Sequence, residues 1–146
     1  MISEFDDHGN LPPGIHHATW HEIMLRYSTN THRHELLDGL LDALRSLKNA
    51  GCATAYLDGS FVTAQEHPGD FDVCWESAGV VLDRLDPELR DFSQERAAQK
   101  ARYGGELFPA DWAANPGGMP FLDFFQRDRI TKQPKGIIAI DLTGLP

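Results

Sequence analysis

The chain has 146 residues and a mass of 16.3 kDa, which is the size of one domain. Hydrophobic residues make up 41% and charged residues 24%, a globular composition that excludes a wholly disordered protein. The formal net charge of −9 excludes a surface coated with basic side chains, as non-specific nucleic-acid binding would require.

Nothing in the sequence indicates a membrane span or export. No apolar run reaches the roughly 18–20 residues of a transmembrane helix, and the acidic residues 1–7 lack the basic region of a signal peptide. The two cysteines, Cys52 and Cys74, provide neither a disulfide framework nor a paired metal motif. We therefore expect a reduced, cytoplasmic protein with no membrane contact.

The chain divides into a short arm and one domain. Residues 1–18 are predicted to be an irregular arm, because Pro12-Pro13-Gly14 cannot continue a helix or a central strand. His16 or His17 is expected to anchor this arm through a hydrogen bond. Residues 19–146 then form the domain.

Two helices open the domain. Residues 19–22 have the pattern of a capping box, with Thr19 as N-cap, which predicts a short helix to about Tyr27. Asn30 or Thr31 is expected to cap a second helix, and Gly51 is expected to end it. Leucines recur at helical spacing along this second helix: Leu36, Leu37, Leu40, Leu41, Leu44 and Leu47.

Three segments predict β-strands. Residues 53–58 and Phe71–Trp75 are rich in residues that favour strands, and residues 136–142 form the continuous apolar run of a buried strand. With helices before and between them, these strands predict an α+β domain. We expect a small mixed sheet with helices packed mainly on one side.

The segments between the last two strands are less regular. Residues 80–85 predict a helical turn, and Pro87 is expected near the start of a helix that extends to about Arg102. Residues 106–120 are rich in proline and glycine and predict a loop. Phe121–Phe125 fits either a strand or a helix.

Three carboxylates stand out on the predicted strands. Because strand side chains alternate between faces, Asp70 and Asp72 point the same way, roughly 6.5–7 Å apart along the backbone. Like charges at the head of an apolar strand repel each other unless a cation neutralises them. Asp141 lies between Ile140 and Leu142 in the most apolar strand, where an unpaired charge is costly. We expect Asp141 to be hydrogen-bonded or metal-bound.

These carboxylates and a Gly-Ser pair together suit phosphate chemistry. Three carboxylates on neighbouring strands can hold two Mg²⁺ ions about 3.5–4 Å apart, the geometry of in-line displacement at phosphorus. Gly59, directly after a strand, lets the backbone approach a phosphate closely. Ser60 adds a hydroxyl, and a helix beginning there would offer free N–H donors to an anion.

The same residues resemble the hallmark of the DNA polymerase β-type nucleotidyltransferase superfamily. That hallmark is a Gly-Ser after the first core strand, then Asp-x-Asp, and a third Asp or Glu between apolar residues on a later strand. Gly59-Ser60, Asp70-Phe71-Asp72 and Ile140-Asp141-Leu142 match this order and context. The resemblance covers residues 53–75 and 136–142.

The resemblance implies a role for each matched residue. Asp70 and Asp72 would bind two divalent ions, Mg²⁺ or Mn²⁺, that bridge the phosphates of an NTP. Asp141 would bind the catalytic metal and help to deprotonate the acceptor hydroxyl. Gly59 and Ser60 would hold the β- and γ-phosphates of the leaving pyrophosphate.

The implied function is a Mg²⁺-dependent nucleotidyltransferase that moves NMP from an NTP to a hydroxyl of RNA, protein or a small molecule. Single-domain members of the superfamily often belong to bacterial toxin–antitoxin or defence pairs. The resemblance therefore implies a protein partner, toxin or antitoxin, and tRNA as a candidate acceptor.

A catalytically inactive module of the same fold, an antitoxin or regulatory subunit, is the alternative. After Ser60 small members commonly carry a small residue, an arginine and a glycine, where this chain has residues Phe61, Val62 and Thr63. An acidic surface can also mask a basic partner. Taken singly, Asp72 could be an ion-pair partner and Asp141 could cap a turn.

Seven histidines raise the question of a zinc site. His17 and His21 are four positions apart, but the cap expected at Thr19 separates them. His32 and His34 diverge on a helix, and no HExxH motif is present. We therefore expect no dedicated zinc site.

Overall fold

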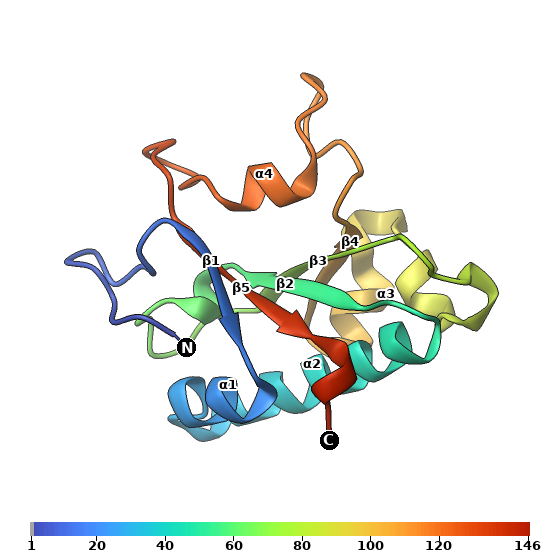
Figure 1. Ribbon diagram of the computed structural model, residues 1–146, viewed down its shortest axis with the longest axis horizontal. Coiled ribbons are helices and arrows are strands. Elements are labelled where there is room, and N and C mark those ends of the chain that lie inside the picture. The colour runs from blue at the N-terminus through green and yellow to red at the C-terminus, as the bar shows by residue number, and fades with distance from the viewer. Residues whose placement is uncertain (1) are drawn as a thin grey trace.

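Five strands form one mixed sheet in the order β1-β5-β2-β3-β4 in the computed structural model, which describes residues 2–146 (Figure 1). The strands are β1 Gly14–Ala18, β2 Thr54–Asp58, β3 Phe71–Trp75, β4 Gly105–Pro109 and β5 Gly136–Asp141. β1 runs parallel to β5 and β3 to β4, whereas β2 is antiparallel to both of its neighbours. The predicted α+β fold with a small mixed sheet is confirmed.

The helices cover the two faces of the sheet unequally. They are α1 Trp20–Tyr27, α2 Thr31–Asn49, α3 Ser93–Tyr103 and α4 Phe121–Phe125. α1 and α2 lie on one face and the short α4 on the other (Figure 1). The larger core packs between α2 and the sheet, with Leu40, Leu44, Leu57, Val73 and Ile138 fully buried in it. A smaller apolar cluster, which includes Cys74, Phe125 and Ile137, lies under α4.

The capping signals in the sequence set the helix ends. Thr19 Oγ1 accepts from the backbone N–H of Glu22, whose carboxylate accepts from the N–H of Thr19, so the predicted capping box is confirmed. Asn30 caps α2 by accepting from the N–H of Arg33. Gly51 follows Ala50, the C-cap of that helix, with a φ of +102°, as expected for a glycine just beyond a helix end.

The prediction of an irregular arm over residues 1–18 is wrong in its last part. Gly14–Ala18 forms β1, which pairs with β5 at the edge of the sheet. An edge strand tolerates prolines directly before it, because one of its sides needs no backbone partner. The predicted anchor of the arm is confirmed at His16, whose Nε2 lies 2.7 Å from the carbonyl oxygen of Pro12.

The loop predicted over residues 106–120 begins with a strand that the sequence reasoning missed. β4 pairs in parallel with β3 and buries Leu107 against the larger core. The strand is only five residues long and ends in Pro109, so the sequence pattern did not distinguish it from a loop. The ambiguous segment Phe121–Phe125 is a helix.

The helix predicted from Pro87 to about Arg102 is interrupted. Pro87–Arg90 is a 3₁₀ turn, and α3 begins only at Ser93. Asp91 breaks the helix because its carboxylate accepts from both the N–H and the hydroxyl of Ser93, which competes with helical hydrogen bonding.

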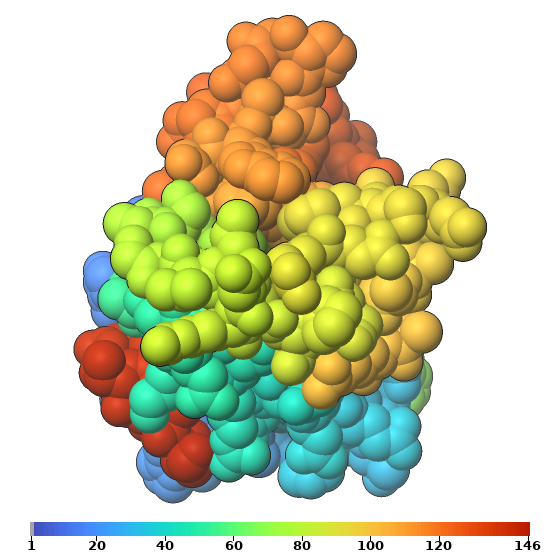
Figure 2. All heavy atoms as spheres, turned by 90° about the vertical axis from the view of Figure 1, so that its right-hand side faces the viewer, coloured from blue at the N-terminus to red at the C-terminus, as the bar shows by residue number. Residues whose placement is uncertain are grey.

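The segment that carries α4 projects from the sheet. Figure 2 shows residues near 110–125 as a ridge above the body of the molecule. Two isolated bridges, Ala113 with Pro120 and Arg127 with Pro134, hold this ridge together on either side of the helix. Among the described residues, no helix combines the length and apolar character needed to cross a membrane.

Candidate active site

One end of the sheet brings carboxylates from three strands together. Asp58 on β2 is the register partner of Asp72 on β3, and Asp72 is the partner of Glu106 on β4. Their neighbours Leu57, Val73 and Leu107 point into the larger core, so all three carboxylates lie on the opposite face, which carries α4.

Burial and neighbouring negative charges raise the pKa values of Asp70 and Asp72 in this cluster. Burial, as the largest cause, and the negative charges of Asp70, Asp58 and Glu106 together raise the pKa of Asp72 to about 7. Burial and the charge of Glu106 also raise the pKa of Asp70. A group of carboxylates that resists ionisation at the end of a sheet is a candidate functional site.

Basic side chains neutralise the two outer carboxylates. Lys135 Nζ lies 2.9 Å from Asp58 Oδ1, and Asp58 is buried. Glu106 pairs with Lys100 at 3.0 Å and with Arg96 at 3.4 Å.

The two inner carboxylates lack such partners. Within the described part of the chain, Asp70 and Asp72 form neither an ion pair nor a side-chain hydrogen bond. Among the four carboxylates of the cluster, Asp70 and Asp72 are therefore the two without a direct ion-pair partner in the described chain. A cation bound between them would remove their repulsion.

The Gly-Ser pair lies directly against Asp72. Gly59 has a φ of +89°, and a Cβ at this position would lie only 2.8 Å from Asp72 Oδ2. Only glycine fits this backbone conformation and this contact. Ser60 begins a 3₁₀ turn, Ser60–Val62, rather than the longer helix considered from the sequence. The structure thus brings Gly59 and Ser60 together with Asp72, as predicted.

The segment after Ser60 is fixed by the first turn of α2. Arg33 is buried and donates to three backbone carbonyls of that segment, those of Phe61, Thr63 and Gln65, at 2.7, 2.9 and 2.5 Å. Sequence reasoning missed Arg33. Its only signal was a basic residue on the leucine-rich helix, which is usually an exposed position.

The prediction that Asp141 is a buried third carboxylate of the site is wrong. Its register partner is Thr54, at the opposite end of β2 from Asp58, because β5 runs antiparallel to β2. Four residue steps along a strand separate these ends by about 13 Å. Asp141 and Asp72 are therefore not brought together.

Asp141 has a structural role instead. It is exposed, and its carboxylate accepts from the N–H of Thr143 at 3.0 Å and from the hydroxyl at 2.7 Å. These hydrogen bonds lower the pKa of Asp141. The alternative interpretation, in which Asp141 caps a turn, is confirmed.

Glu106 takes the position that the sequence assigned to Asp141. It lies beside Asp72 on the adjacent strand and on the same face of the sheet. The sequence indicates this role only weakly. Glu106 is a charged residue between Gly105 and the apolar Leu107, in a segment predicted as a loop.

The donor set of the cluster suits a hard cation. Asp70, Asp72 and Glu106 offer only carboxylate oxygens, which are the ligands of Mg²⁺ and Mn²⁺. Within residues 2–146, no three His, Cys, Asp or Glu side chains are already arranged to hold a metal ion, at the histidines or here. Asp70 and Asp72 are available to a cation. Glu106 would first have to break its ion pairs with Lys100 and Arg96.

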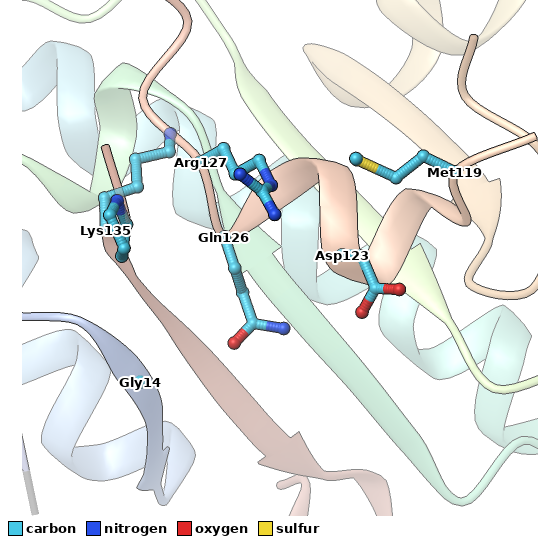
Figure 3. Close-up of a pocket in the computed structure, with 7 residues that line it drawn as sticks. Gly14, Met119, Asp123, Gln126, Arg127 and Lys135 are labelled. Carbon is cyan, nitrogen blue, oxygen red and sulfur yellow. The ribbon is translucent and has the colours of Figure 1, made fainter. Parts of the chain in front are cut away.

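A pocket of about 320 Å³ borders the cluster between α4 and the start of β5 (Figure 3). Its lining combines two cations, one carboxylate and neutral groups: Arg127, Lys135, Asp123, Met119, Gln126 and Gly14, with Pro134 beside them. Lys135 belongs both to this pocket and to the ion pair with Asp58, so the two features are continuous.

The model of one protein family, described as a family of unknown function (DUF6932), matches residues 3–141. No curated protein and no solved structure matches the chain.

Proposed function

Because the chain belongs to this family of unknown function, we propose its activity from the site alone: a Mg²⁺-dependent nucleotidyltransferase that moves NMP from an NTP to a hydroxyl. One observation carries the proposal. Asp72 lies in register between Asp58 and Glu106, in contact range of Gly59, and forms no ion pair with any residue that the structure describes.

Each carboxylate has a different role in this proposal. Asp70 and Asp72 hold the divalent ion, and Glu106 replaces Asp141 as the third carboxylate. The ion, when bound, supplies the positive charge that phosphate oxygens need during displacement. Glu106 accepts the proton of the acceptor hydroxyl, while the new O–P bond forms and the bond to pyrophosphate breaks.

The Gly-Ser pair receives phosphate oxygens. Gly59 carries no side chain, so its backbone packs directly against the Asp72 carboxylate and would lie beside a phosphate held there by a bound ion. Ser60 lies at the start of a 3₁₀ turn and contributes its hydroxyl. This arrangement supports binding of the leaving phosphates at the end of β2.

The acceptor and the cellular setting follow from charge and composition. A net charge of −9 favours a hydroxyl on a protein or a small molecule at least as much as one on tRNA. We propose a bacterial toxin–antitoxin or defence pair as the context, with a protein partner. Two buried free thiols, Cys52 and Cys74, support a reducing, cytoplasmic location.

Transfer of label tests the activity. Purified protein is incubated with each labelled NTP, Mg²⁺ or Mn²⁺, and tRNA or a protein extract as acceptor. We expect transfer that Asp72→Asn and Glu106→Gln abolish and Asp141→Asn retains. Absence of label above the Asp72→Asn background with every nucleotide and acceptor contradicts the proposal.

A second candidate is a binding module without catalysis. The observation that favours it is the neutralised state of Glu106, held by Lys100 and Arg96. Such a module would bind a basic partner protein equally well after alanine substitution of Asp70 and Asp72. It would also show no thermal response to Mn²⁺, which distinguishes it from the enzyme.

A further inference from the structure

Asp58, Asp72 and Glu106 form a row of carboxylates across β2, β3 and β4. The charged groups beside the two ends of this row differ. Glu106 on β4 marks one end, and Lys135, directly before β5, lies beyond the other. The sheet order β5-β2-β3-β4 puts them on opposite sides of Asp72. The ion pair of Lys135 with Asp58 on β2 fixes this side of the row.

In-line displacement gives these two sides different roles. The entering oxygen and the leaving oxygen lie on opposite sides of the reacting phosphorus. If Glu106 faces the acceptor hydroxyl, the leaving pyrophosphate lies toward Asp58 and Lys135. This step rests on the proposed function, which assigns Glu106 to the acceptor side.

The pocket beyond Lys135 carries two cations on adjacent segments of the chain. The bridge between Arg127 and Pro134 and the hydrogen bond from Lys135 N–H to the carbonyl of Gln126, at 2.8 Å, hold the segments side by side. Arg127 and Lys135 lie at one end of the pocket and Met119 at the other (Figure 3). Among the lining side chains, two positive charges face the single negative charge of Asp123.

Both cations retain donors for a ligand. A lysine ammonium has three N–H donors, and Asp58 occupies one side of Lys135. Arg127 forms no ion pair with any described carboxylate, so its planar fork is open to phosphate oxygens. The volume of about 320 Å³ lies within the roughly 300–1,000 Å³ typical of small-molecule sites.

We propose that this pocket, together with Gly59 and Ser60, binds the pyrophosphate end of the nucleotide, with Arg127 and Lys135 as the phosphate ligands on the pocket side. Asp58 is then a positioning residue that holds the Lys135 ammonium at the junction of the pocket and the carboxylates. The base and sugar lie outside this pocket. Arg127 therefore strengthens the binding of every nucleotide equally and does not select one base over another.

Titration calorimetry with inorganic pyrophosphate tests the inference, because it needs no catalysis. The protein is titrated with and without Mg²⁺, as wild type, Arg127→Gln and Arg129→Gln. Arg129 is exposed on the same loop, outside the pocket lining, so its variant loses the same charge. We expect Arg127→Gln to weaken binding about tenfold or more, and Arg129→Gln to leave it within about twofold of wild type.

The outcomes separate the inference from the proposed function. Equal pyrophosphate affinity for Arg127→Gln and Arg129→Gln overturns the pocket assignment, even if Mn²⁺ binding still depends on Asp72. Loss of affinity confined to Arg127→Gln supports the assignment. Mn²⁺ binding that is unchanged in Asp72→Asn overturns the proposed function, while pyrophosphate binding without metal still reports on the pocket.

Discussion

Glu106 is the register partner of Asp72 on the adjacent parallel strand. The pairing puts two carboxylates side by side at one end of the sheet, while Asp141 occupies the other end. Any metal held by Asp72 should therefore depend on Glu106 and not on Asp141.

Thermal unfolding with Mn²⁺ measures this dependence. A ligand that binds only the folded protein at ten to a hundred times its Kd stabilises it by ~1–3 kcal/mol. We expect millimolar Mn²⁺ to raise the Tm of the wild type and of Asp141→Asn. Asp72→Asn should lose the response, and Glu106→Gln should lose most of it. A response that requires Asp141 and not Glu106 would restore the assignment made from the sequence.

The raised pKa of Asp72 gives the metal-free protein a defined pH dependence. With a pKa of about 7 in the folded state against 3.8 ordinarily, folded Asp72 binds a proton more tightly than unfolded Asp72. The free energy of unfolding should therefore fall as the pH rises from about 4 to about 7. Asp72→Asn should flatten this slope and stabilise the protein at pH 8 by up to about 4 kcal/mol, because each pKa unit of difference corresponds to about 1.4 kcal/mol.

Urea unfolding between pH 4.5 and pH 8.5 tests the slope. Asp141→Asn is the matched control, because it replaces an exposed carboxylate whose pKa is lowered rather than raised. It should leave the slope near neutral pH unchanged. If Asp72→Asn instead destabilises the protein at pH 8, then Asp72 is a structural partner and carries no excess charge.

Gly59 should tolerate no side chain. Gly59→Ala combines a positive φ with a clash against the Asp72 carboxylate, and we expect a loss of about 1–3 kcal/mol in unfolding free energy. Gly69 is the control, because a Cβ there meets no atom within 4 Å and its φ is not positive. Gly69→Ala should change stability by less than ~0.5 kcal/mol. Equal effects of the two variants would contradict the contact with Asp72.

Arg33 should be essential for the segment that follows Ser60. Arg33→Met removes the donors of three backbone carbonyls, so we expect a loss of about 3 kcal/mol or more by urea unfolding. Arg45→Met is the comparison, since the exposed Arg45 side chain hydrogen-bonds, among the described residues, only to the carbonyl of Pro146. A small effect of Arg33→Met would mean that other contacts of α2 suffice to hold the segment.

The sequence predicted what local chemistry determines. Thr19 and Asn30 fixed helix starts through their own side chains, and Phe71–Trp75 was predicted at its observed bounds. The Gly-Ser pair and the two aspartates lie close together in the sequence: Gly59, Ser60, Asp70 and Asp72. Their proximity in the fold therefore followed from the antiparallel pairing of β2 with β3.

Long-range pairing explains what could not be predicted. Whether β5 runs parallel or antiparallel to β2 decides which end of the sheet receives Asp141, and no local pattern carries that direction. Glu106 was missed for a related reason, because β4 is a short edge strand whose pairing with β3 is what defines it.

The position of β5 also has a consequence for the order of folding during synthesis. β5 lies between β1 and β2. The first strand, which begins at Gly14, therefore has no strand to pair with until the segment that begins at Gly136 has been synthesised. Until residues 136–141 leave the ribosome, β2 exposes one unpaired edge and its apolar surroundings lack Ile138 and Ile140. Such a late, sequence-distant closure slows folding and leaves the nascent chain open to edge-to-edge aggregation.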